Sequence, residues 1–121
     1  MEARDLALYF SADAAAANQR FLNRPFRLRG TVDSFDPKML RQRYDVILGT
    51  ADRAMRVVCA FGYPEGTKAV FTKKGGRTLV RVSERGAEIP LLEAGQTVVV
   101  EGRCEGAADG EVRFRALRIV P

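Results

Sequence analysis

The sequence predicts a mainly β protein: a closed five-stranded barrel with an N-terminal α-helix and a β-hairpin-like insertion after the third strand. Residues 26–36 alternate between apolar and polar side chains, which is typical of a strand with one buried face. Four further segments have strand-like patterns, and short polar turns separate the first three. The 121-residue chain is long enough for one structural domain with its own core.

Residues 3–23 precede the barrel and predict a helix. Apolar side chains recur at helical spacing from Leu6 to Phe21, which places them on one face. Ser11 could cap a second, shorter helix, with Asp13 favouring its first turn, so one bent helix and two helices both fit the pattern. Pro25 ends the helical segment. We therefore expect residues 1–25 to pack as a helix on a barrel formed by residues 26–121.

Five segments are expected to form the barrel. Gly30 lies in the apolar phase of the first, where a bend would let the sheet curl. Near Ala116 the apolar phase of the last segment slips by one, which predicts a bulge with Leu117 and Ile119 facing inward. Residues 50–53 read as a turn. The predicted strands are residues 26–36, 44–49, 54–61, 97–104 and 111–120.

Residues 62–94 form the predicted insertion between the third and fourth barrel strands. Two β-like runs, 68–72 and 77–83, flank the hairpin loop 73–76. Residues 88–93 fit an extended segment or one helical turn. Five barrel strands, a glycine in the first, this excursion and a closing bulge together indicate an OB-fold, a five-stranded Greek-key barrel.

The chain is basic, with a net charge of +5 and a pI of about 9.7. The excess lies in residues 26–96 rather than in a tail, since residues 26–61 carry seven basic and four acidic side chains. This distribution fits a surface that faces a polyanion, and it also fits a solvated basic exterior.

Catalysis is not indicated by the sequence. The chain has no histidine, so general-base chemistry at neutral pH would need a perturbed carboxylate, lysine or cysteine. There is no paired-carboxylate motif, nucleophile elbow, phosphate loop or metal-ligand cluster. We expect a protein that is not an enzyme and that uses neither a metal nor a cofactor.

Cys59 and Cys104 share the inward phases of their predicted strands. On neighbouring strands they could form a disulfide if the protein is exported, but two buried thiols that act as small apolar fillers are the favoured interpretation. No signal-peptide-like apolar run and no stretch of membrane-spanning length is present. We expect a cytoplasmic protein on that basis, or a periplasmic or envelope protein if a signal has been removed.

Candidate binding residues follow from the barrel. An OB-fold binds ligands on the face around strands two and three and with the loops after strands one and four. Those loops are predicted at 36–43, which is basic, and at 105–110, which is acidic. Phe35, Tyr44 and Tyr63 are the aromatic candidates for base stacking. The candidate set for nucleic-acid binding is Arg27, Arg29, Lys38, Arg41, Arg43, Tyr44, Arg56, Arg103 and Arg113.

Four motifs in order resemble a known family: A-x-x-x-F-x-x-R-x-F-x-L-R-G-T-V-D-S-F at 17–35, V-x-C-x-F at 57–61, G-Q-T-V-V-V-E-G-R-C-E-G at 95–106 and V-x-F-x-x-L-x-I-V at 112–120. Together they resemble the tRNA_anti-like group of bacterial OB-fold domains, over most of residues 5–121 except about 62–90. Such relatives often carry a third cysteine where this chain has Leu117, and their middle connection is shorter.

This resemblance implies a nucleic-acid type of OB-fold, and many of the relatives look like envelope proteins. We therefore expect a non-enzymatic module that binds single-stranded nucleic acid or another polyanion. The alternative is a structural or interaction domain of the bacterial envelope that binds a protein or a glycan. The oligomeric state is left open.

Overall fold

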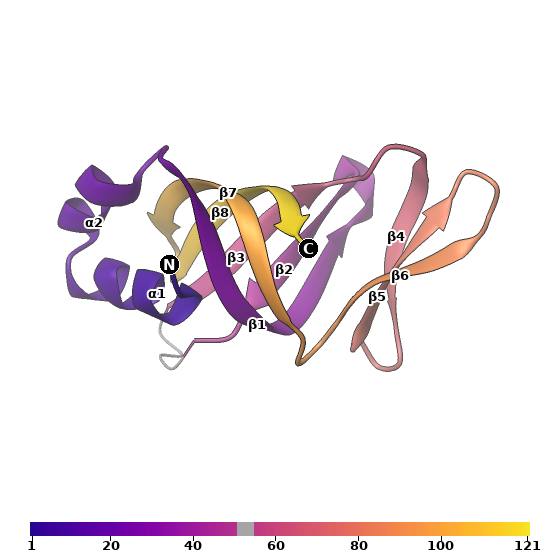
Figure 1. Ribbon diagram of the computed structural model, residues 1–121, viewed down its shortest axis with the longest axis horizontal. Helices are drawn as coiled ribbons and strands as arrows, with labels where there is room; N and C mark the ends of the chain where they lie inside the picture. Colours follow the sequence, from indigo (N-terminus) through magenta and orange to yellow (C-terminus); the bar gives the residue numbers. More distant parts are fainter. Residues whose placement is uncertain (51–54) are drawn as a thin grey trace.

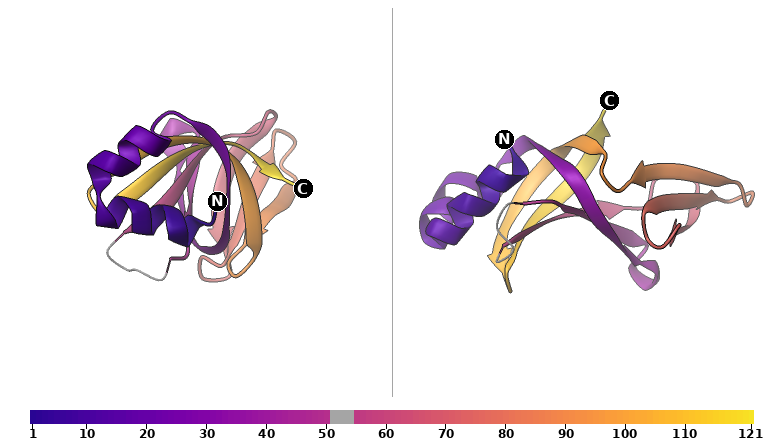
Figure 2. Two further views of the ribbon diagram at one scale, coloured as in Figure 1. Left: turned by 60° about the vertical axis from the view of Figure 1, so that its left-hand side comes forward. Right: turned by 90° about the horizontal axis from the view of Figure 1, so that it is seen from below.

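A computed structural model of the chain describes residues 1–50 and 55–121, and it confirms a mainly β protein with helices at its N-terminus. The described residues form eight strands in two sheets, because the insertion forms three strands of its own. The helices and the second sheet lie at opposite ends of the barrel (Figures 1 and 2). The elements are α1 (Ala3–Ala12), α2 (Ala14–Phe21), β1 (Pro25–Lys38), the 3-10 turn η1 (Met39–Arg41), β2 (Arg43–Leu48), β3 (Arg56–Gly62), β4 (Thr67–Lys73), β5 (Thr78–Ser83), β6 (Glu88–Glu93), β7 (Thr97–Ala108) and β8 (Glu111–Val120).

The N-terminal segment is two helices rather than one. Asp13 separates them, and its side chain accepts a hydrogen bond from the Ala16 backbone N–H at 3.1 Å. Asp13 is therefore the N-cap of α2, whereas the predicted cap, Ser11, lies within α1. Leu6, Phe10 and Phe21 are buried in the core that the helices share with the barrel. Within the described residues, no helix is long and apolar enough to cross a membrane.

The barrel closes in the order β1-β2-β3-β8-β7. The β3–β8 pair is parallel and the other pairs are antiparallel. The first half of β1 pairs with β7 and the second half, from Val32 on, pairs with β2. Gly30 lies just before this change of partner, where a Cβ would be 3.1 Å from both Ala3 Cβ and Leu48 Cδ1. The absence of a side chain therefore lets α1 and β2 close on β1.

The closing strand β8 contains the predicted bulge, but its extra residue is Leu117. Gly102 of β7 pairs with Ala116 and Glu101 pairs with Arg118, which leaves Leu117 outside the ladder. Leu117 is 69% exposed, so the prediction that it faces inward is wrong. Its side chain is displaced to the surface because the bulge inserts one residue and shifts the phase of the strand.

The connection between β7 and β8 is shorter than the predicted loop 105–110. β7 continues to Ala108, and only Asp109 and Gly110 lie between the strands. Both have positive φ, 54° and 75°, as in the two-residue turns that suit the twist of a hairpin. Glu105 is consequently a strand residue. The predicted first loop is also reduced, because β1 extends to Lys38 and β2 begins at Arg43.

The insertion is an antiparallel sheet in the order β4-β5-β6. The predicted hairpin corresponds to β4 and β5, and residues 88–93 add the third strand, which decides between the two alternatives for that segment. Val70, Leu79 and Leu92 are buried in the same apolar cluster as the barrel core. The predicted turn at 50–53 and the predicted start of the third strand at Ala54 fall largely on residues 51–54, outside the described residues.

Candidate nucleic-acid interface

The outward faces of β1, β2, β3 and β8 form a groove of about 1040 Å³, which we call the outer-face groove. Backbone register places its side chains in two rows across the strands. η1 and β7 contribute Arg41 and Glu105 to its walls. The first row is Ser34, Ile47, Val58 and Arg113, and the second row is Asp36, Asp45, Ala60 and Arg115.

The floor of the outer-face groove is apolar. Ile47, Val58 and Ala60 point outward from β2 and β3, yet they are only 6%, 2% and 4% exposed. The accessible lining of the groove therefore comes mainly from the charged side chains around this floor.

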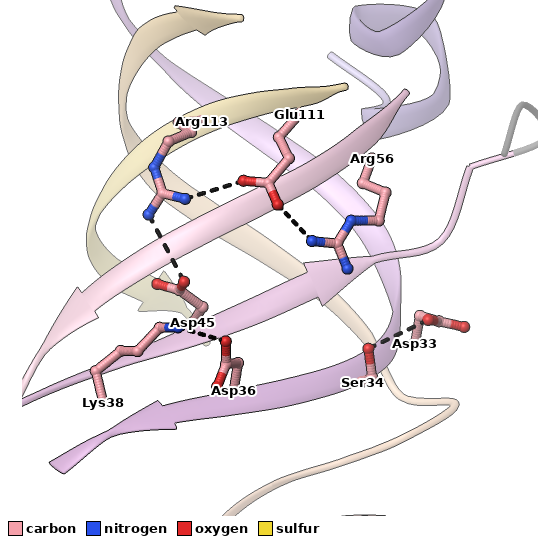
Figure 3. Close-up of polar contacts among 8 residues, drawn as sticks. All are labelled: Asp33, Ser34, Asp36, Lys38, Asp45, Arg56, Glu111 and Arg113. Carbon is pink, nitrogen blue, oxygen red and sulfur yellow. Dashed lines mark hydrogen bonds and ion pairs between the residues drawn. The ribbon is translucent and has the colours of Figure 1, made fainter. Parts of the chain in front are cut away.

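Several cations of the groove are neutralised by neighbouring carboxylates (Figure 3). Glu111 pairs with Arg56 and, at 3.1 Å, with Arg113. Arg113 also lies 3.6 Å from Asp45, and Lys38 pairs with Asp36 at 2.6 Å. The hydrogen bond from Arg56 lowers the pKa of Glu111, and the hydrogen bond to Asp36 raises the pKa of Lys38. These groups are thus held in their charged forms and paired.

Three other arginines of the groove have no ion pair with any described residue. Arg41 ends η1, Arg43 begins β2, and Arg115 lies on β8; all three are exposed. In the ladder, Lys38 and Gly62 are opposite Arg43, and Ala60 and Arg103 are opposite Arg115, so neither arginine has a carboxylate directly opposite it. We call Arg41, Arg43 and Arg115 the open arginines.

Arg115 was missed by the sequence analysis. Its signal was available, because it lies two residues after Arg113 and therefore on the same outward face of the strand. The sequence analysis predicted a bulge near Ala116, directly beside Arg115 in the chain. The bulge comes only at Leu117, and Arg115 keeps its outward direction.

Three of the predicted cations lie away from the outer-face groove. Arg27 pairs with Glu101 at 3.4 Å, and Arg29 pairs with Glu2 at 3.6 Å. Arg103 donates a hydrogen bond to the Asn23 carbonyl at 2.8 Å. They belong to β7 and to the half of β1 that pairs with it. The structure therefore gathers Lys38, Arg41, Arg43, Arg56 and Arg113 in the outer-face groove, and these three do not belong to its described lining, although Arg103 is opposite Arg115 in the β7–β8 ladder.

Tyr44 is placed with its ring toward the interior. It is 4% exposed and stacks on Phe61, with ring centroids 5.1 Å apart and planes nearly parallel. Burial raises the pKa of Tyr44 to about 12, so its hydroxyl stays protonated at neutral pH. Its ring cannot act as a stacking platform on the outer-face groove.

Cys59 and Cys104 are both buried, free thiols. They were expected on neighbouring strands, but β8 lies between β3 and β7, and both cysteines pair with Phe114. Two strand spacings separate their backbones by roughly 10 Å, beyond the reach of a disulfide. Burial raises the pKa of Cys59 to about 12 and also raises that of Cys104, so neither is a ready thiolate.

The described residues contain no group of three or more cysteine, aspartate or glutamate side chains that could hold a metal ion. The carboxylates of the outer-face groove instead face arginines and a lysine. The chemistry of this face is therefore that of charge and apolar contact.

A comparison with protein-family models matches residues 1–117 to the model described as tRNA_anti-like. The matched region contains the two helices, the insertion and nearly the whole barrel. No curated protein and no solved structure matches the chain. Since the family model covers almost all of the chain, this protein belongs to the tRNA_anti-like family.

Proposed function

We propose that the barrel is an OB-fold and that the protein is a non-enzymatic module that binds single-stranded nucleic acid or another polyanion. The strand order β1-β2-β3-β8-β7, with one parallel pair, supports the OB-fold. Membership of the tRNA_anti-like family supports a nucleic-acid ligand through the family's name. The outer-face groove lies on the strands with which OB-folds bind their ligands.

The observation that carries this proposal is the cluster of open arginines at one end of the groove. A phosphate that approaches Arg41, Arg43 or Arg115 meets a cation with no competing carboxylate in an ion pair. At Arg56 or Arg113 the same phosphate lies beside Glu111, whose charge opposes it. The open arginines are thus the strongest attractors for an anion on this face.

The proposal that the protein is not an enzyme rests on the chemistry of its titratable groups. The chain has no histidine, and burial raises the pKa of both cysteine thiols. The pKa of Glu111 is lowered by its arginines, which makes this carboxylate a weaker proton acceptor. These groups suit recognition of charge better than proton transfer.

The test is a titration of a fluorescent single-stranded oligonucleotide at salt concentrations from about 50 to 200 mM, with duplex of the same sequence as control. Three phosphate contacts to a single strand predict a log–log salt slope of about −2. Micromolar binding with this slope supports the proposal. No binding at the lowest salt would contradict it and would favour an interaction domain for a protein or glycan.

A further inference from the structure

A second groove, of about 800 Å³, lies beside the outer-face groove, and the open arginines line both. Its walls come from the beginning of β2, the end of β3, residues 63–64 and the second half of β8. Tyr44, Phe61 and Tyr63 all belong to its lining, and we call it the aromatic groove. The open arginines therefore form a boundary that one ligand can contact from both sides.

The two grooves differ in their acidic residues. Four carboxylates line the outer-face groove: Asp36, Asp45, Glu105 and Glu111. Aspartate and glutamate are absent from the described lining of the aromatic groove, which has a fourth arginine, Arg118, paired with Glu101 at 3.3 Å. A polyanion therefore meets less repulsion in the aromatic groove than in the outer-face groove.

The aromatic groove also offers surfaces for flat, apolar groups. Tyr63 is half-buried and is the aromatic side chain available in this lining, and Tyr44 and Phe61 form a stacked pair that is only 4% and 5% exposed. The hydroxyl of Tyr44 makes no hydrogen bond to a described residue, and its raised pKa keeps it a donor. The β8 bulge adds Leu117, which is 69% exposed, to the same lining.

A cationic groove that also contains aromatic side chains is the arrangement that proteins use for single-stranded nucleic acid. Polyphosphate and sulfated glycans carry the charge but have no flat ring to place against Tyr63 and Leu117. We propose that the aromatic groove holds the bases of a single strand whose phosphates lie on the open arginines. This rests on the proposed function and narrows its ligand class to single-stranded nucleic acid.

Tyrosine emission reports directly on this groove, because the chain has three tyrosines and no tryptophan. Tyr9→Phe removes the one on α1 and leaves Tyr44 and Tyr63, both in the lining. A twelve-residue oligothymidylate should quench this emission to saturation, after correction for absorption by the bases. Polyphosphate of equal charge should not quench it. Oligonucleotide binding without quenching would overturn the inference.

Introducing a negative charge at Leu117 tests the same site through affinity. Leu117→Glu places a carboxylate in the aromatic groove alone, and the exposed position allows the variant to fold. Leu8→Glu is the matched control, since Leu8 is 52% exposed on α1. We expect Leu117→Glu to weaken oligonucleotide binding by about tenfold and the control by less than about twofold.

The outcomes separate the two proposals. If the unaltered protein binds no oligonucleotide, the proposed function itself is wrong. If it binds, and Leu117→Glu binds as well as Leu8→Glu, the strand does not enter the aromatic groove and only the inference fails. Thermal unfolding of each variant by circular dichroism verifies that the folds are equal.

Discussion

Two sets of arginines on the same barrel have opposite surroundings. Arg27 and Arg29, on the first half of β1, pair with Glu101 and Glu2. The open arginines, at the end of η1, at the start of β2 and on β8, have no ion pair among the described residues. The side chains are chemically identical and all are exposed, so the difference lies in what the fold places next to them.

Backbone pairing explains why Arg27 and Arg29 have carboxylate partners. β1 pairs with β7 over residues 25–31, which brings Glu101 opposite Arg27 in the ladder. An isolated bridge between Glu2 and Arg29 brings the second carboxylate from the N-terminal segment. Exposed ion pairs contribute only about 0–1 kcal/mol, so their effect here is on the local field more than on stability. A phosphate at either arginine would lie close to a carboxylate.

The largest expected effect comes from charge reversal of two open arginines, compared with charge reversal of the two paired arginines. Arg41→Glu with Arg43→Glu should weaken single-stranded DNA binding by about 100-fold, because two attractive contacts become repulsive. Arg27→Glu with Arg29→Glu, which changes net charge equally, should weaken it by less than about threefold. Fluorescence anisotropy at one low salt concentration measures both. Equal losses would mean that net charge, and not the open arginines, determines binding.

A smaller effect is expected from the loss of one open arginine. Arg115→Ala should weaken binding by about tenfold and make the salt slope shallower by about 0.7, the value of one single-strand phosphate contact. Arg27→Ala should leave the slope unchanged. The comparison needs the full salt series for both variants. A normal slope for Arg115→Ala would remove that residue from the interface.

Converting paired arginines to unpaired ones should strengthen binding. Glu111→Gln removes the carboxylate that neutralises Arg56 and Arg113, so affinity should rise by about threefold. Glu2→Gln, which releases Arg29 outside both grooves, is the control and should change affinity less. A loss of affinity in Glu111→Gln would show that the carboxylate itself contacts the ligand.

The smallest effect concerns pH. Because Arg56 and Arg113 lower the pKa of Glu111 in the folded protein, its charge stabilises the fold above its ordinary pKa of 4.5. This contribution is lost as the pH falls through the lowered value. The difference in unfolding temperature between the unaltered protein and Glu111→Gln should therefore be present at pH 7 and vanish in acid. A difference that persists in strong acid would indicate a cause other than the ion pair.

Much of the fold was predictable because strand alternation is a local property. The last strand was predicted with its observed bounds, 111–120, and the cysteines were correctly expected to point inward. The errors concern the order of strands and the position of the bulge. Cys59 and Cys104 were expected on neighbouring strands, but β8 lies between them. Leu117 was expected to face inward, but it is itself the bulge residue, and a shift of one position changes the face to which a strand side chain points.

Part of the candidate site was also predictable, because strand alternation identifies the side chains that point outward. Outward phases identified Arg56 and Arg113, and the basic loop identified Arg41 and Arg43. Arg27, Arg29 and Arg103 have the same local pattern but lie outside the described lining of the groove. The alternation of a strand tells which side chains point outward, and it does not tell on which side of a closed barrel they lie.

From the sequence alone follow most of the strands, most of their inward faces, the net basic charge and the family. Which arginines are neutralised and which are open, and that Tyr44 and Tyr63 line a groove with the open arginines, depends on the folded barrel. The physical reason is that an ion pair and a groove depend on atoms within a few ångströms, and barrel closure brings together residues as distant as Arg41 and Arg115.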